Sequence, residues 1–377
     1  MGNFIIKIYN DMLDSAKNGD RIIYYGASIF PAKFEDLTID HIEGYFRCGE
    51  KENCISEEQK DYFSQNNNRV KHMFSIYLLG IYCYDRIMPI KNAFNRFIEN
   101  KIRKNIKEDN TQNKDECLRN DFLYLWFLTA LYHDMGYLYE NKGDNDASLY
   151  SFIIERKNMM SNDNLGFYPV SGIPRNLQLA AAEYFWNRRN NIFFNENLCT
   201  DHGFAGGFKL YTTLKKLHQE RGKESVKPVE PSGLQFGMPI FQWYNVPSAW
   251  AIICHNIWLA EGGSGLAVKY EALNLDKLIY LKGDSPVKLK NHPLLFLLDF
   301  VDTIDPEKCF GNTCEKATIS SGTRKLSISL NCPWTDNKYC SCFSEKIKKL
   351  DKDMDFLKSD LFHTETSEQT ISFLFSA

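Results

Sequence analysis

The feature that most constrains the fold is a set of apolar helical runs that each carry an ionisable residue. The run DFLYLWFLTALYHDMG ends near His133 and Asp134, PSAWAIICHNIWLA contains His255, and LLFLLDFVDTID contains Asp302. Such runs are shorter than the roughly 18 residues that span a bilayer, so we expect core helices and no membrane span. An ionisable group buried in a core helix must be paired, change its protonation state or bind a metal.

Hydrophobic periodicity predicts a mainly α-helical protein. A first helix is expected from about Asn3 to Lys17, and a long one from Asn68 to Pro89, where proline should break or kink it. The polar stretch KEDNTQNKDECLRN is expected to be a loop, and Gly136 is expected to stop the helix that follows. Other helices are expected at residues 177–191, 201–222, 249–260 and 294–305.

The chain of 377 residues is long enough for one large domain with an appendage, or for two domains. We expect an N-terminal segment at 1–64, a helical metal-binding domain at 65–307, and a small α+β appendage at 308–377. Alternation in ATISSGTRKLSISL predicts a hairpin, a lysine-rich helix should begin at Phe343, and TISFLF should form a last strand.

The formal net charge of −3 gives no general reason to bind duplex nucleic acid or an acidic membrane. The eleven cysteines and the absence of a signal-like start predict a cytoplasmic location. The spacings C-x4-C and C-x-C late in the chain match no common zinc knuckle, so we interpret those cysteines as free thiols.

Four of the eight histidines lie in apolar helical contexts: His72, His133, His202 and His255. The other four, His41, His218, His292 and His363, lie in polar or helix-boundary settings, and we interpret them as ordinary structural residues. Imidazole and carboxylate ligands together suit one or two divalent transition metals such as Mn, Fe, Co, Ni or Zn, with Mg as a further possibility.

The order His72, His133-Asp134, His202, His255, Asp302 resembles the signature of the HD superfamily of metal-dependent phosphohydrolases, in the form with two extra histidines. The phrases ALYHDMGY, DHGFAGG, AWAIICHN and HPLLFLLDFVDTID carry the resemblance over about residues 65–307. It implies an HD-domain helical bundle, with His72 and His133 on one metal, His202 and His255 on the other, Asp134 bridging and Asp302 completing the ligands. His133 and Asp134 would form the catalytic centre.

Two details differ from parts of that superfamily or leave the assignment open. Tyr137 stands where cyclic-dinucleotide phosphodiesterases of the superfamily often have lysine, and no Gly-Tyr-Pro follows the third histidine. Asp299 and Asp305 lie one turn on either side of Asp302, so the acidic ligand could shift by a turn. We prefer Asp302 because VDTID matches the final acidic motif best.

Recognition of a phosphate ester or nucleotide requires cations. The candidates are Arg188 and Arg189, Lys209 on the helix of His202, and Arg69 with Lys71 beside His72; the alternative for each is a solvated surface charge.

The segment from Arg221 to Pro247 is long and rich in proline and glycine, so we expect a lid. Trp243 and Tyr244 in it are candidates to stack on a base, against the alternative that both simply pack.

These residues predict a phosphodiesterase that acts on a nucleotide or cyclic nucleotide through a binuclear metal centre and an activated water. Di-iron oxygenases of the HD fold have the same ligand set and form the second hypothesis. The third is a nucleotide-binding sensor with a non-catalytic core and an interaction module at its C-terminus.

Overall fold

The computed structural model of the chain describes one set of segments, to which every structural statement below applies. These are residues 2–18, 23–24, 38–39, 41–42, 65–103, 113–139, 202–221, 241–255, 288–290, 292–306, 308, 316–331, 357, 361–366 and 370–375.

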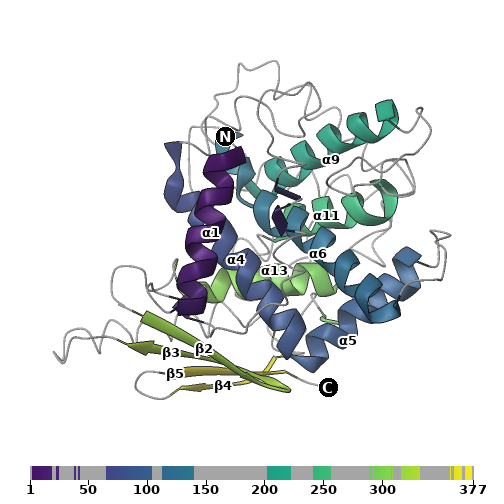
Figure 1. Cartoon of the computed structure of the whole chain (residues 1–377). Coiled ribbons are helices and arrows are strands. Elements are labelled where there is room, and N and C mark those ends of the chain that lie inside the picture. Colours follow the sequence, from purple (N-terminus) through teal and green to yellow (C-terminus); the bar gives the residue numbers. More distant parts are fainter. Residues whose placement is uncertain are drawn as a thin grey trace, which may run out of the picture.

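The prediction of a mainly α-helical protein with a small C-terminal appendage is confirmed, and Figure 1 shows the helices above a small sheet. The helices α4, α6, α11 and α13 lie together, with α1 along one side and α9 above. Three short helices of π or 3-10 type adjoin them: η1 (Ile98–Arg103), η2 (Met135–Tyr139) and η4 (Phe241–Asn245). The α-helices are α1 (Gly2–Asn18), α4 (Asn67–Arg86), α5 (Met88–Phe97), α6 (Lys114–Tyr132), α9 (His202–Arg221), α11 (Val246–Cys254) and α13 (Pro293–Ile304).

Helix α6 forms the centre of the core, because apolar residues cover nearly its whole circumference. The Trp126 indole is fully buried and donates a hydrogen bond to the carbonyl of Tyr77 on α4, at 2.9 Å. A Cβ on Gly80 of α4 would lie 2.2 Å from the Trp126 ring, so only glycine leaves room for the indole there. The α4–α6 contact is therefore close and specific.

The predicted start and end of helix α6 were both wrong. The helix begins at Lys114, within the stretch predicted as a loop, because the Asn113 side chain accepts a hydrogen bond from the Asp115 N–H and caps it. The helix ends at Tyr132, and Gly136 lies within η2 instead of stopping α6. The boundary places His133 and Asp134 at the end of a buried helix.

The described strands form one five-stranded sheet in the order β1-β2-β3-β5-β4. The predicted hairpin is confirmed as β2 (Lys316–Gly322) and β3 (Lys325–Asn331), paired in antiparallel register from Lys316 opposite Asn331 to Gly322 opposite Lys325. The last strand is confirmed as β5 (Thr370–Phe375), between β3 and the edge strand β4 (Leu361–Thr366). The helix predicted from Phe343 lies outside the described residues.

Several contacts join the sheet to the helical body and to the N-terminal segment. The short strand β1 (Ile23–Tyr24), from the N-terminal segment, pairs in parallel with β2. On α13, the Phe300 ring contacts the rings of Phe373 and Phe375, at centroid distances of 5.3 and 5.1 Å. The domain boundaries at 64/65 and 307/308 stay predictions, but the sheet takes a strand from each end of the chain.

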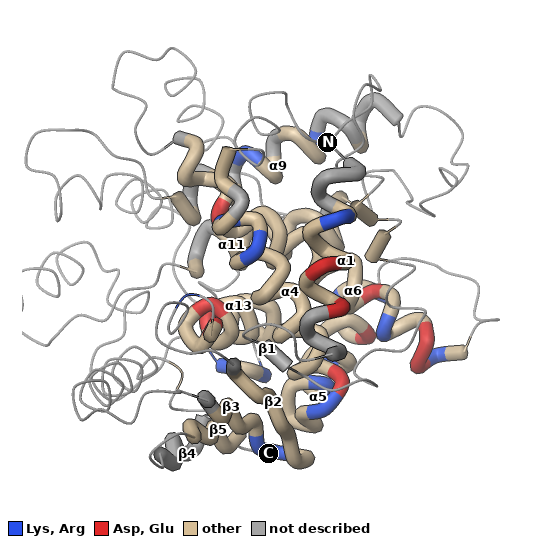
Figure 2. Tube along the Cα trace, turned by 60° about the vertical axis from the view of Figure 1, so that its left-hand side comes forward, with Lys and Arg blue, Asp and Glu red and all other residues tan. Residues whose placement is uncertain are grey.

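Acidic and basic residues are interspersed along the described helices, as expected from the small net charge (Figure 2). Among the described helices, none combines the length and the apolar character that crossing a bilayer requires.

Buried histidines make the stability of the metal-free fold depend on pH. Burial lowers the pKa of His41, His133 and His292 to about 4, from 6.5 in an unfolded chain. Between these values the folded protein binds fewer protons than the unfolded chain, so stability falls as the pH decreases. The free energy of unfolding should fall between pH 7 and pH 5, and we expect His41→Gln to make that fall smaller by roughly 2 kcal/mol, measured by denaturant unfolding. An unchanged pH dependence would show that His41 is not held neutral by burial.

Candidate metal centre

His133 and His255 have the same local arrangement, each at the C-terminal end of a buried helix. The Nδ1–H of His133 donates to the carbonyl of Ala130 at 2.8 Å, and that of His255 donates to the carbonyl of Ile252 at 2.7 Å. This bond places the proton on Nδ1 and leaves the lone pair on Nε2. Both Nε2 atoms are buried without a hydrogen-bond partner in the described part of the chain. A metal ion would satisfy such orphaned nitrogen atoms.

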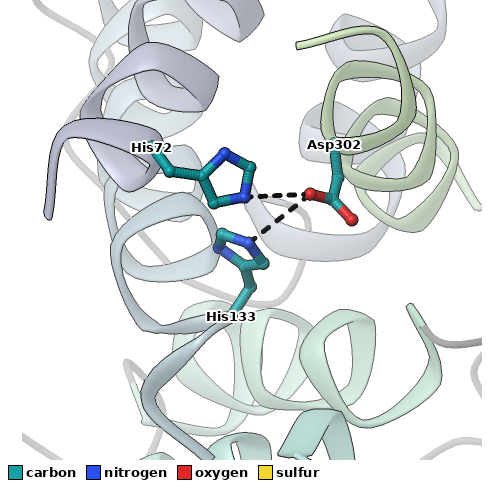
Figure 3. A group of neighbouring side chains, drawn as sticks. All are labelled: His72, His133 and Asp302. Atoms are coloured by element: carbon teal, nitrogen blue, oxygen red, sulfur yellow. Dashed lines mark ion pairs between the residues drawn. The ribbon is translucent and has the colours of Figure 1, made fainter. Parts of the chain in front are cut away.

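The first ligand group comprises His72 from α4, His133 after α6 and Asp302 on α13 (Figure 3). Its donor atoms lie within 4.8 Å of one another. Asp302 Oδ1 lies 3.1 Å from His72 Nε2 and 3.9 Å from His133 Nε2. Ligands bonded to one ion at about 2.1 Å lie roughly 3–3.5 Å apart, so these positions fit a metal after small side-chain movements.

The second ligand group comprises Asp134, His202 and His255, whose donor atoms also lie within 4.8 Å of one another. Asp134 lies between the two groups: its Oδ1 is 3.7 Å from His202 Nε2, and its Oδ2 is 3.7 Å from His72 Nε2. The six residues predicted as ligands therefore lie together in two groups, and Asp134 of the second group also lies near His72 and His133 of the first.

The structure separates the three carboxylates of α13. Asp302 faces the histidines, whereas Asp305 accepts a hydrogen bond from His72 Nδ1 at 2.6 Å and another from the Ser75 hydroxyl. A carboxylate behind a histidine orients the ring toward a metal. Asp299 is buried, and its two carboxylate oxygens have no hydrogen-bond partner among the described residues. Of the three, only Asp302 belongs to a ligand group, so the choice of Asp302 agrees with the geometry.

Burial and neighbouring groups shift the pKa values of several side chains in the centre. Burial lowers the pKa of His133 to about 4, so its ring is neutral near pH 7, as a metal ligand must be. Burial also opposes a charge on His72, but hydrogen bonds to Asp302 and Asp305 outweigh it and raise the pKa of His72 to about 10, so a metal ion bound by this ring would have to displace its proton. Burial would raise the pKa of Asp134, yet the imidazoles around it hold that pKa well below its usual range.

Three glycines allow α9 to approach the centre closely. A Cβ on Gly136 would lie 1.6 Å from the carbonyl oxygen of His202, and one on Gly206 would lie 2.9 Å from the Gly136 nitrogen. A Cβ on Gly203 would lie 2.8 Å from the His255 ring. The phrase DHGFAGG therefore brings the start of α9 against η2 and α11, which positions His202.

Three planar groups stack at the edge of the centre. The Tyr137 ring lies parallel to the His202 ring, with a centroid distance of 3.9 Å and an angle of 13°. The Arg69 guanidinium also lies over the Tyr137 ring, with its Cζ 3.4 Å from the ring centroid. Arg69 also donates to Asp134 Oδ2 at 3.0 Å. The residue that departs from the superfamily pattern, Tyr137, thus contacts a predicted ligand and a predicted phosphate-binding cation.

The predicted substrate-binding residues fall into three classes. Arg188 and Arg189 lie outside the described residues. Lys209 is a partly buried residue of α9, and Trp243 is a partly buried residue of η4; neither belongs to a ligand group. Tyr244 is buried, and the structure assigns it to packing.

For Tyr244, a candidate either to stack on a base or simply to pack, the described contacts agree with packing. Only 4% of its surface is exposed, and its hydroxyl donates to Asp121 at 2.8 Å. Its ring contacts the Tyr124 ring at a centroid distance of 5.6 Å. Residues 222–240 of the proposed lid lie outside the described residues, and the end of that segment forms η4 and the start of α11.

Burial alone does not separate ligand histidines from structural ones. His41, His218 and His292, predicted to lie in ordinary polar or helix-boundary settings, are all buried, with at most 6% of their surface exposed. His41 instead packs against the rings of Tyr124 and Phe127. Among the described histidines, membership of a ligand group distinguishes the four candidates.

Sequence analysis missed one residue in contact with the centre. Lys308 Nζ lies 2.7 Å from Asp302 Oδ1, and its side chain is 52% exposed. No sequence signal marked it, since a lysine just after a helix is ordinarily a solvated charge. The late cysteines, from Cys309 to Cys342, lie outside the described residues.

Comparisons of the chain with family models, with curated proteins and with solved structures find no match.

Replacing Gly136 with alanine should displace α9 from η2, because the new Cβ would overlap the His202 carbonyl. We expect Gly136→Ala to lower stability by about 1–3 kcal/mol and to weaken metal binding at the second group. Denaturant unfolding and metal titration measure the two effects. Gly322→Ala is the matched control, because its Cβ would meet Lys325 at an ordinary 3.9 Å; equal effects in both variants would contradict the close-approach account.

Removing one ligand of the second group should lower the metal content without unfolding the protein. We expect about two ions per chain in the wild type and about one in His202→Ala and in His255→Ala, measured by elemental analysis after equilibration with Mn²⁺. His41→Gln is the control, a buried histidine outside both groups, and should keep two ions. Two ions retained in both alanine variants would show that other residues build the second site.

Proposed function

We propose that the chain is a metal-dependent phosphohydrolase that cleaves a phosphodiester of a nucleotide or cyclic nucleotide. The observation that carries the proposal is the pair of buried Nε2 atoms of His133 and His255 that have no hydrogen-bond partner among the described residues, one in each ligand group. We also propose a cytoplasmic location, which the odd number of cysteines supports.

Several features of the centre support two metal ions instead of a structural histidine cluster. Buried imidazoles without a hydrogen-bond partner destabilise a core unless another ligand satisfies them. Asp134 has carboxylate oxygens near both groups: Oδ1 lies 3.2 Å from His133 Nε2 and 3.7 Å from His202 Nε2, and Oδ2 lies 3.7 Å from His72 Nε2. His72 is held by Asp305 from behind, so its Nε2 stays directed at Asp302. The donor set of nitrogen and oxygen atoms fits divalent transition metals.

A pair of divalent ions would supply a water acidic enough to attack phosphorus near neutral pH, together with positive charge for the phosphoryl oxygens. The protein residues would then orient the ions and the substrate. His133 and His255 are held in one tautomer by backbone carbonyls, so their rings need no reorganisation. Asp134 fixes the separation of the two groups because it contacts both. No side-chain nucleophile is needed for this chemistry.

Arg69 is the described cation best placed to contact the substrate phosphate. Its side chain is 37% exposed, and its guanidinium lies over the Tyr137 ring and 3.0 Å from Asp134 Oδ2. A planar guanidinium with several N–H donors suits two oxygens of a phosphate group. Because Tyr137 contacts both Arg69 and the ring of His202, a phosphate bound by Arg69 would lie near the second ligand group.

We expect Mn²⁺-loaded wild type to hydrolyse bis(p-nitrophenyl) phosphate and cyclic nucleotides, with phosphate-ester cleavage unchanged when oxygen is removed. Asp134→Asn should lower kcat/KM at least about a hundredfold, because it weakens ligands of both ions at once. Asp85→Asn is the control; Asp85 pairs with Arg86 at the other end of α4. Turnover that requires iron and oxygen, without hydrolysis of the phosphodiester substrates, would favour the oxygenase hypothesis instead.

A further inference from the structure

Lys308 contacts the same carboxylate oxygen that the first ligand group shares. Asp302 Oδ1 lies 2.7 Å from the Lys308 ammonium, 3.1 Å from His72 Nε2 and 3.9 Å from His133 Nε2. Figure 3 shows both histidines directed at that one oxygen. The ammonium therefore supplies, in the metal-free protein, part of the positive charge that an ion in the first group would supply.

The ammonium reaches this oxygen from the solvent side. The Lys308 side chain is 52% exposed, whereas Asp302 is 16%, His72 13% and His133 0% exposed. Its charge also acts on Asp134 and Tyr137. A substrate that enters from solvent on this side would meet Lys308.

A lysine ammonium and a divalent ion compete for one carboxylate oxygen, because both are cations drawn to the same negative charge. Their repulsion is strong when the two cations lie about 4 Å apart in a partly buried site. The flexible four-carbon stem of a half-exposed lysine allows the ammonium to move away without a change in the backbone. The ammonium then needs an anion near the centre.

We propose that Lys308 is a substrate-binding residue that exchanges partners: it pairs with Asp302 in the metal-free protein and with a phosphate oxygen of the substrate once metal is bound. The exchange makes anion binding depend on metal occupancy, so the ions bind first and the phosphate second. The identity of the anion as a phosphate ester rests on the proposed function, but the exchange itself does not.

The test compares two titrations of the full-length protein by calorimetry, Mn²⁺ into metal-free protein and inorganic phosphate into Mn²⁺-loaded protein. In Lys308→Gln we expect Mn²⁺ to bind as tightly as in wild type or several-fold tighter, because a competing cation is lost. Phosphate should bind about ten- to a hundredfold more weakly, as expected for the loss of a charge-assisted hydrogen bond. Lys308→Arg should keep phosphate affinity within about threefold, because the charge remains.

Lys114→Gln is the matched control, because Lys114 is an exposed lysine paired with Glu99 on the solvent-facing side of η1 and α6; neither titration should change. In wild type, phosphate should bind the metal-free protein at least tenfold more weakly than the loaded protein, a result that requires no variant. Unchanged phosphate affinity in Lys308→Gln, weakened Mn²⁺ binding in it, or equal phosphate binding with and without Mn²⁺ would each overturn the exchange. Absence of hydrolysis by the loaded wild type would overturn the proposed function alone, because the titrations do not depend on turnover.

Discussion

The placement of His133 at the end of the buried helix α6 is the constraint on which the rest of the centre depends. Its Nδ1–H is held by the carbonyl of Ala130, so its Nε2 points into a region where the described residues offer it no hydrogen bond. Burial keeps the ring neutral. The adjacent Asp134 adds a carboxylate whose charge must also be compensated. Every element around this helix end contributes a group that meets one of these needs.

The surrounding helices converge on that point for reasons visible in their sequences. Helix α13 is apolar except where it carries acidic residues, and it presents Asp302 to the histidines. Helix α9 begins at His202, and the small residues Gly203 and Gly206 let its first turns lie against η2 and α11. The centre is thus built by close backbone approach as much as by the ligands themselves.

Much of this arrangement could be predicted from sequence, because ionisable residues in apolar helices have few alternatives to pairing or metal binding. The helical class follows from hydrophobic periodicity and the hairpin from the alternation of apolar and polar residues, whereas the division of the six candidate ligands into two groups came from the family resemblance. Other features could not be predicted, because they depend on tertiary contacts. Lys308 and Asp305 meet Asp302 and His72 only after folding, and Tyr244 is buried although its segment resembled a loop. Burial of a histidine was not a sufficient criterion, since other histidines are equally buried.

The central claim is that two groups of three side chains each hold one divalent ion. Anomalous diffraction from crystals equilibrated with Mn²⁺, recorded at the manganese absorption edge, tests it most directly. The account predicts two peaks in each chain, one bounded by His72, His133 and Asp302 and the other by Asp134, His202 and His255, each about 2.0–2.3 Å from its ligand atoms. The absence of a peak between these side chains, or ions bound only elsewhere, would contradict it.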